Sequence, residues 1–194
     1  MTEDSISLKK KLEDSKKYLQ NADLKGADLS EVDLKGALLA GADLRGANLS
    51  KAFFGEADLS NANLAEANLE EANLNSASLS KVNLKGAKMH ALYARLADLR
   101  GANLSNADVS KANLRQCSMF KVWMRNSDFS GANLQNIKGA QSQMQDSKFC
   151  GAKMEGAELT GARLDGADME GAVLQVANLS RAVLKNTNFK GADL

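Results

Sequence analysis

Only a few side chains in this sequence could take part in catalysis or metal binding. The chain has a single histidine, His90, and two cysteines, Cys117 and Cys150. A catalytic or zinc site needs several such groups close together. One histidine excludes every arrangement that requires two, and the cysteine spacing matches no zinc motif. We therefore predict no catalytic residue, no metal ligand and no bound cofactor.

The carboxylates and serines recur at fixed intervals and do not form a cluster. Ser30, Ser50, Ser60 and Ser80 occupy equivalent positions, where short polar residues stabilise turns. The glycines follow the same spacing, so none begins a phosphate-binding loop that leads into a helix. The sequence therefore predicts that the protein is not an enzyme.

Aromatic and basic residues form the best candidate for a binding surface. Residues 85–125 contain eight Lys or Arg residues and two acidic ones, whereas residues 52–80 contain five acidic residues and no Lys or Arg. In the basic stretch, Tyr93 and Trp123 replace residues that are polar in most of the chain. Exposed aromatic rings beside positive charge are typical of protein interfaces. The candidate protein-binding patch consists of Tyr93, Arg95, Arg115, Phe120, Lys121, Trp123 and Arg125.

A repeat of five residues must hold these side chains in place. Each unit has the pattern Ala-Asp/Asn-Leu-x-x, as in ADLKG at residues 22–26, and the units continue to Leu194. Of 35 central positions counted from Leu24, all but Ala94 and Gly139 are Leu, Met, Phe or Val. Glycine lies two residues after a centre in 13 of its 15 occurrences, where a turn would use its positive φ. The repeat therefore decides how every other residue is displayed.

A period of five residues excludes both a long helix and a long strand. An α-helix turns by about 100° per residue, so successive units would drift by about 140° and share no face. A continuous strand would send successive central residues to opposite faces. Within one unit, however, the small and the central residue share one side of a very short strand. Two turn residues can then direct the next unit inward, which predicts a solenoid with stacked parallel strands.

The unit resembles that of the pentapeptide-repeat proteins over residues 22–194. This resemblance implies an all-β fold, a right-handed, four-sided parallel β-helix with one unit per side. Residue n would then stack on residue n+20, in nearly nine coils and a rod on the order of 40 Å long. The same spacing places Phe129, Phe149 and Phe189 on one side of the interior. Where Ala94 and Gly139 occupy centres, a large residue fills the preceding small position, which predicts local repacking without a change of register.

The two ends of the chain differ from the repeat. Leu8, Leu12 and Leu19 recur at helical spacing, which predicts a short amphipathic helix within residues 5–19. We expect residues 1–20 to form a cap over the open edge of the solenoid, which comprises residues 21–194. The alternative is that residues 1–20 form a partly frayed tail. At the other end, Phe189 and Leu194 would be uncovered. The candidate dimer end therefore comprises these two residues, and a longer protein is the alternative to a homodimer through the C-terminal coils.

Length and charge restrict where the protein works. The 194 residues have a formal net charge of +1, and no apolar run reaches the length of a membrane span or the core of a signal peptide. One domain, a cytoplasmic location and no membrane partner are expected.

The sequence indicates a non-catalytic scaffold or protein-binding rod whose partner is unknown. The alternative rests on the family: some members confer quinolone resistance by mimicking DNA and protecting a type II topoisomerase. Mimicry needs a long acidic surface, and the acidic band here spans only about a coil and a half. Nucleic-acid binding through Tyr93 and Trp123 is a weaker alternative because the chain is nearly neutral. The alternative to a binding patch is that scattered exposed aromatic residues belong to an ordinary protein surface.

Overall fold

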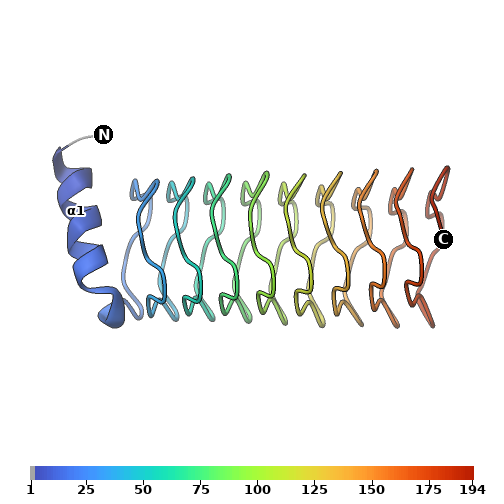
Figure 1. Ribbon diagram of the computed structural model, residues 1–194, viewed down its shortest axis with the longest axis horizontal. Coiled ribbons are helices and arrows are strands. Elements are labelled where there is room, and N and C mark those ends of the chain that lie inside the picture. Colours follow the sequence, from blue (N-terminus) through green and yellow to red (C-terminus); the bar gives the residue numbers. More distant parts are fainter. Residues whose placement is uncertain (1–2) are drawn as a thin grey trace.

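The structure, a computed structural model, describes the backbone of residues 3–194 and the side chains of residues 6–194. The chain forms a rod, with α1 (Glu3–Asp14) and the short 3-10 helix η1 (Lys16–Tyr18) at one end. Stacked coils follow, and α1 lies across the end of the stack (Figure 1). The first two residues of the predicted cap segment 1–20 lie outside the described residues. Neither α1 nor η1 is long and apolar enough to cross a membrane.

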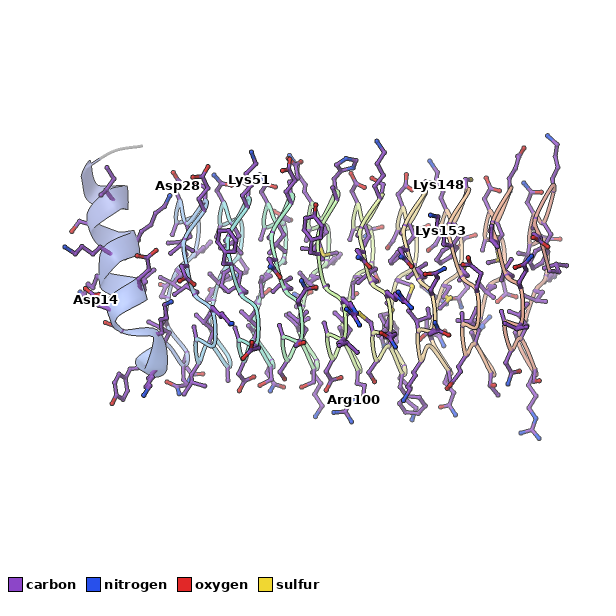
Figure 2. The ribbon with its side chains drawn as sticks, viewed as in Figure 1. Asp14, Asp28, Lys51, Arg100, Lys148 and Lys153 are labelled. Carbon is purple, nitrogen blue, oxygen red and sulfur yellow. The ribbon has the colours of Figure 1, made fainter. Side chains whose placement is uncertain are left out.

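Parallel pairing joins residues that are twenty positions apart. The bridges run from Asp23 with Asp43 to Val173 with Asp193, at intervals of five residues. Each is an isolated bridge of one residue, so the short strands expected from the sequence are reduced to single paired residues between turns. Because four units separate paired residues, each coil has four sides, as predicted. Figure 1 shows these coils following one another along the rod, and Figure 2 shows the same view with the side chains added.

The four sides are named here by their outward residues, which recur every twenty positions. Side one contains the column that begins at Asp23, and side two the column that begins at Asp28. Side three begins at Asp33 and side four at Leu38. Two turn residues form the corner after each side. Sides one and three therefore lie opposite each other, as do sides two and four.

Main-chain hydrogen bonds tie each coil to its neighbours. The outward residue donates to the preceding coil, as from Asp43 N–H to the Ala22 carbonyl at 2.9 Å. The central residue donates to the following coil, as from Leu24 N–H to the Asp43 carbonyl at 2.8 Å. A turn bond from Ala27 N–H to the Leu24 carbonyl, 3.1 Å, closes the corner. The second turn residue also donates to the following coil, so four of the five N–H groups in such a unit have backbone partners.

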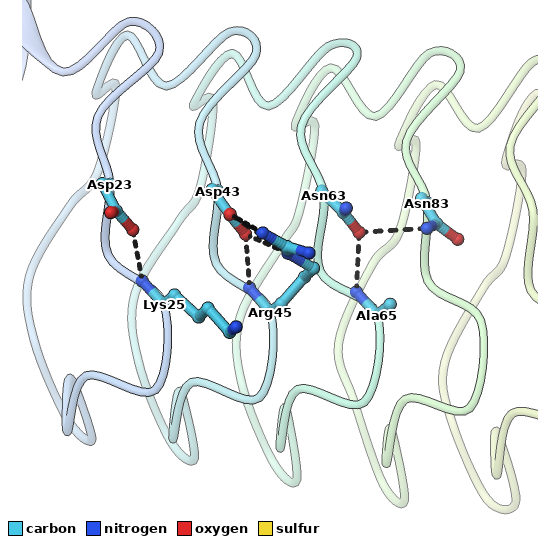
Figure 3. Close-up of polar contacts among 7 residues, drawn as sticks. All are labelled: Asp23, Lys25, Asp43, Arg45, Asn63, Ala65 and Asn83. Atoms are coloured by element: carbon cyan, nitrogen blue, oxygen red, sulfur yellow. Dashed lines mark hydrogen bonds and ion pairs between the residues drawn. The ribbon is translucent and has the colours of Figure 1, made fainter.

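The outward Asp or Asn accepts the fifth N–H group of its own unit. Lys25 N–H donates to Asp23 Oδ1 at 3.3 Å, and Ala65 N–H donates to Asn63 Oδ1 at 3.2 Å (Figure 3). Asn63 Oδ1 also accepts a bond of 3.0 Å from Asn83 Nδ2 in the next coil. These short side chains favour such local turns. The outward polar position therefore completes the backbone hydrogen bonding of the unit.

The interior is filled by the small and central residues of each unit. Phe129 and Phe149 lie in adjacent coils with ring centroids 5.3 Å apart and planes at 14°, so the predicted aromatic column is present. Ile137 is 1% exposed and fills the space beside Gly139, where an added Cβ would lie 3.0 Å from Leu159 Cδ2. Pairing continues in register through both irregular units. The predicted local repacking is therefore confirmed.

The N-terminal segment contacts the first coil through both apolar and polar groups. Leu12 and Leu19 are buried against the core. Leu38 N–H donates to the Lys16 carbonyl at 2.8 Å, and Asp33 N–H donates to Glu13 Oε1 at 3.0 Å. These bonds replace those that a preceding coil would make. The helix predicted within residues 5–19 is shorter, however, because α1 ends at Asp14 and the chain then turns through η1 to bring Leu19 into the core.

Candidate protein-binding surface

The structure divides the predicted aromatic and basic patch between two opposite sides of the rod. Trp123 lies on side one, Phe120 and Lys121 form the corner before it, and Arg125 lies in the corner after it. The other three residues lie on the opposite side. The unit of Tyr93 precedes that of Trp123 by six units, which is one and a half coils, and a half coil leads from one side of the rod to the opposite one. Side three and its following corner hold Tyr93, Arg95 and Arg115.

The group on side one combines exposed rings with positive charge. The Trp123 side chain is 54% exposed and Phe120 is 39% exposed. Lys121 Nζ lies 5.0 Å from the centroid of the Phe120 ring, within the range of a cation–π contact. Arg125 Nε donates to Gln145 Oε1 at 3.2 Å, which orients the guanidinium along the rod. These residues therefore form one mixed aromatic and basic area.

Two shallow hollows meet at Lys121. One has a volume of about 460 Å³ and extends from Lys121 and Trp123 to Gln143 and Arg163. The other, about 420 Å³, extends from Lys121 and Phe120 toward Arg100. Both are open surface features and not enclosed ligand sites. We call the central set of residues the Trp123 surface: Phe120, Lys121, Trp123, Arg125, Gln143 and Arg163.

Charge is distributed unevenly along side one. Between residues 80 and 143, this side and its two corners contain no Asp or Glu and five basic residues, which are Lys81, Lys85, Arg100, Lys121 and Arg125. Asp98 on side four neutralises part of this charge, since Arg100 Nη2 lies 2.6 Å from Asp98 Oδ2. That hydrogen bond lowers the pKa of Asp98 and raises the pKa of Arg100. Asp146 and Asp165 end the positive stretch in the coils that follow.

The residues on side three form a separate exposed area. Tyr93 is 50% exposed, and Leu96 beside it is 51% exposed. Sequence reasoning missed Leu96, although its place in the second turn position was a usable signal. That position has a φ of +62° here, a conformation that a bulky residue seldom adopts. Side three therefore supplies a second, separate apolar area with Arg95 and Arg115 nearby.

The residues predicted at the C-terminal end share the last coil but occupy different sides of it. Leu194 is 73% exposed, and Phe189 is partly buried against the core. Leu184 in the same coil is 37% exposed. Inward residues of this coil thus present apolar surface at the end of the rod, at the opposite end from α1 (Figure 1).

The potentially reactive residues lie apart from the Trp123 surface. His90 Nδ1 lies 2.9 Å from Ser110 Oγ, which donates to Asp108 Oδ1 at 2.6 Å in the corner after side two. Cys117 is buried, and burial raises the pKa of its thiol to about 12. The Cys150 pKa is also raised, by burial and by its hydrogen bond to Asp168. Within residues 3–194, no three His, Cys, Asp or Glu side chains are grouped to hold a metal ion.

Comparison with known proteins identifies the repeat. The family described as pentapeptide repeats matches this chain with eight copies of its repeat. The matched residues are 18–55, 54–90, 97–136, 142–175 and 164–194. These ranges cover most of the chain, and they coincide with the units whose pairing defines the coils. The chain belongs to the pentapeptide-repeat family. Among curated proteins, none is significantly similar to it in sequence.

Several solved pentapeptide-repeat structures are similar to the chain. One from the Arabidopsis thaliana thylakoid lumen has 32% identity and a TM-score of 0.52, covering 53% of this chain and 73% of that one. HetL, involved in heterocyst differentiation regulation in the cyanobacterium Nostoc sp. strain PCC 7120, has 28% identity and a TM-score of 0.40, covering 94% and 93%. A trypsin-treated form of QnrB1, a plasmid-mediated fluoroquinolone resistance protein, has 19% identity and a TM-score of 0.49, covering 92% and 85%.

Proposed function

We propose that this pentapeptide-repeat protein is a non-catalytic rod that binds a partner protein through the Trp123 surface. The observation that carries the proposal is the exposed indole of Trp123 beside the Phe120 ring, with Lys121 and Arg125 around them. Aromatic and Arg residues supply most of the binding energy at protein interfaces. A solvated side of a rigid solenoid can display such a group without reorganisation on binding, which reduces the entropic cost.

The backbone beneath the Trp123 surface supports this role. Trp123 N–H donates to the Ala102 carbonyl at 2.9 Å, and its carbonyl accepts Leu104 N–H at 2.6 Å. The neighbouring Val122 and Met124 are buried in the core. Trp123 is thus fixed through its main chain, while its side chain makes little contribution to the interior. A binding function and the stability of the fold can therefore be separated by mutation.

Protection of a topoisomerase by DNA mimicry remains the second candidate. The acidic residues between positions 52 and 80 do not line one side, because Glu66 follows side one, whereas Glu70 and Glu71 follow side two. Glu56 lies after side three, and its carboxylate is 3.3 Å from Lys35 Nζ. This ring of charge differs from the long acidic surface that a basic DNA-binding cleft would recognise. A gyrase supercoiling assay with a fluoroquinolone should therefore show no protection.

A site-specific photocrosslinker can test the proposal. Replacing Phe120 by benzoylphenylalanine places the reactive ketone on the Trp123 surface, and the same replacement of Phe53, 51% exposed on side three, is the matched control. We expect the probe at residue 120, and not the one at residue 53, to capture a discrete protein. Excess unlabelled chain should compete, but a chain with Trp123→Ala and Arg125→Glu should not. Equal capture at both positions, or equal competition by the variant, would contradict the proposal.

We also propose that the solenoid is right-handed. Two copies of the chain would pair end to end through Phe189 and Leu194. Support for the pairing is the exposure of Leu194 and Leu184 in the last coil. Among residues 3–194, no helix covers the inward apolar side chains of this coil as α1 covers those of the first coil. Two-fold pairing is the commonest way to cover such a surface. This contact lies away from the Trp123 surface, so the rod could bind its partner as a dimer.

A further inference from the structure

A row of backbone N–H groups near the Trp123 surface lacks the acceptor found in most other units. On side one, the outward residues after Asn103 are Trp123, Gln143, Arg163 and Val183, none of which is Asp or Asn. Within residues 3–194, the N–H groups of Arg125 and Gln145 donate to no protein acceptor. The same holds on side four for Phe120 and Ala140.

Gln143 shows why a longer amide does not replace Asn. Its Oε1 accepts a bond of 3.3 Å from Gln145 Nε2, so its extra methylene carries the carbonyl past the backbone N–H of the turn. In an Asn unit, Ser105 N–H donates to Asn103 Oδ1 at 3.1 Å. Side one therefore changes at Trp123 from units whose own side chain accepts the turn N–H to units in which this donor has no protein acceptor among residues 3–194. Gln145 is only 5% exposed, whereas Phe120 is 39% exposed, so the Phe120 N–H is the more accessible donor.

Positive charge lies next to the exposed donor. Lys121 directly follows Phe120 and, with Arg163, lines the hollow that also contains Trp123 and Gln143, whereas Arg125 lies in the corner at the other edge of side one. Coils are about 4.8 Å apart, so the N–H groups of consecutive coils form a closely spaced row. Hydrogen bonds from N–H groups and guanidinium to a carboxylate are roughly twice as strong as neutral ones.

From these features we infer that the Trp123 surface recognises Asp or Glu side chains in an acidic segment of its partner. A partner carboxylate would take the place that the chain's own Asp or Asn oxygen occupies in other units, with the Trp123 and Phe120 rings packing against the flanking residues. This inference rests on the proposed function and specifies the chemistry of the partner. Nucleic acid fits less well, because its binding requires many phosphate contacts and the whole chain has a net charge of only +1.

The test restores the missing acceptor of the Phe120 unit. Ser118→Asn on side four would place an amide Oδ1 two residues before Phe120 N–H, as Asn103 Oδ1 is placed before Ser105 N–H, and would block this donor without changing the charge. Val173→Asn on side three makes the same change beside Gln175 N–H, away from the surface, and serves as the control. The probe is a fluorescent oligoglutamate peptide at low salt. Trp123 is the only tryptophan, so its emission reports directly on the surface.

We expect the peptide to bind the unmodified chain saturably and to change Trp123 emission. Ser118→Asn should weaken binding by about tenfold, equivalent to one charged hydrogen bond, whereas Val173→Asn should leave it unchanged. Thermal unfolding of both variants establishes that they fold. Equal binding by the unmodified chain and Ser118→Asn, or tighter binding of a short single-stranded oligonucleotide, would overturn the inference. Capture of a partner at residue 120 without peptide binding would contradict this inference alone and would still support the proposed function.

Discussion

The backbone N–H of Arg95 donates to Asn75 Oδ1 in the preceding coil, at a distance of 2.8 Å. In most units the outward residue of the same unit would accept this bond, but Tyr93 occupies that position and has no oxygen near the turn. The neighbouring coil therefore supplies the acceptor. This pair shows that the turn N–H is available to an amide from outside its own unit, and the Trp123 surface is where we propose that a partner supplies such a group.

The first prediction separates the two roles of a repeat unit. Leu104→Asp should prevent folding or cost several kcal/mol, because it buries an unpaired charge in a core shared with adjacent coils. Asn103→Ala should cost about 1 kcal/mol, because Ser105 N–H loses its acceptor. Thermal and urea unfolding followed by circular dichroism measure both. Equal effects of the two substitutions would mean that the inward and outward positions have been assigned wrongly.

The second prediction concerns acid stability. The hydrogen bond from the Arg45 side chain lowers the pKa of Asp43 from 3.8 to about 2. Because the folded pKa is the lower one, the stabilisation is complete above the unfolded value near 3.8 and is lost as the pH falls toward 2. Asp43→Asn keeps an acceptor for Arg45 N–H but cannot titrate. Its melting temperature should therefore fall less than that of the unmodified chain between pH 4 and pH 2, and parallel decreases would contradict this assignment.

The third prediction concerns the two thiols. Cys117 is buried, its pKa is raised to about 12, and its Sγ donates to the Ala94 carbonyl. Cys150 is partly exposed at a corner, and its pKa is raised less strongly. Because the thiolate reacts with alkylating reagents, mass spectrometry should show slow iodoacetamide labelling of Cys150 in the folded protein. Cys117 should react only on unfolding, and labelling of both at the same rate would show that its position is open to solvent.

The fourth prediction concerns the proposed end-to-end pairing. Leu194→Lys would place charge at a residue that is 73% exposed, and Phe189→Glu would place it at a partly buried position of the same coil. Either change should convert a dimer into a monomer in analytical ultracentrifugation. Lys190→Glu is the control, since Lys190 lies in the same coil but projects from a corner toward Glu170. A monomer at tens of micromolar with the unmodified end would refute the pairing.

Much of the architecture could be predicted from the sequence because each unit repeats the same pattern of small, polar, large apolar and turn residues. The alternation of small and central residues indicated which side chains are buried, including Phe129 and Phe149. The role of the outward Asn103 was missed, because a polar residue between two apolar ones also fits a solvated surface. The hydrogen bonds that decide its role come from turn geometry, which only the structure shows.

The candidate surface was predicted less well than the fold. Tyr93 and Trp123 were grouped because both lie in one basic stretch of sequence, but a solenoid places neighbours by multiples of twenty residues. Counting by four units would have separated Tyr93 from Trp123 and brought Gln143 and Arg163 to the latter. The free donors at Arg125 and Gln145 could not be found in this way, since their significance depends on the bond that Asn103 makes.

The most direct test of the account measures partner binding and folding together. The protein identified by the probe at residue 120 is prepared separately in free form and titrated into the unmodified chain and into Trp123→Ala combined with Arg125→Glu, with thermal unfolding of each chain recorded in parallel. We predict saturable binding to the unmodified chain. In isothermal titration calorimetry, the double variant should lose at least tenfold in affinity while its melting temperature changes by no more than about 4 °C. Equal affinity of the two chains, or unfolding of the variant, would show that the exposed aromatic and basic group on side one is not the binding surface.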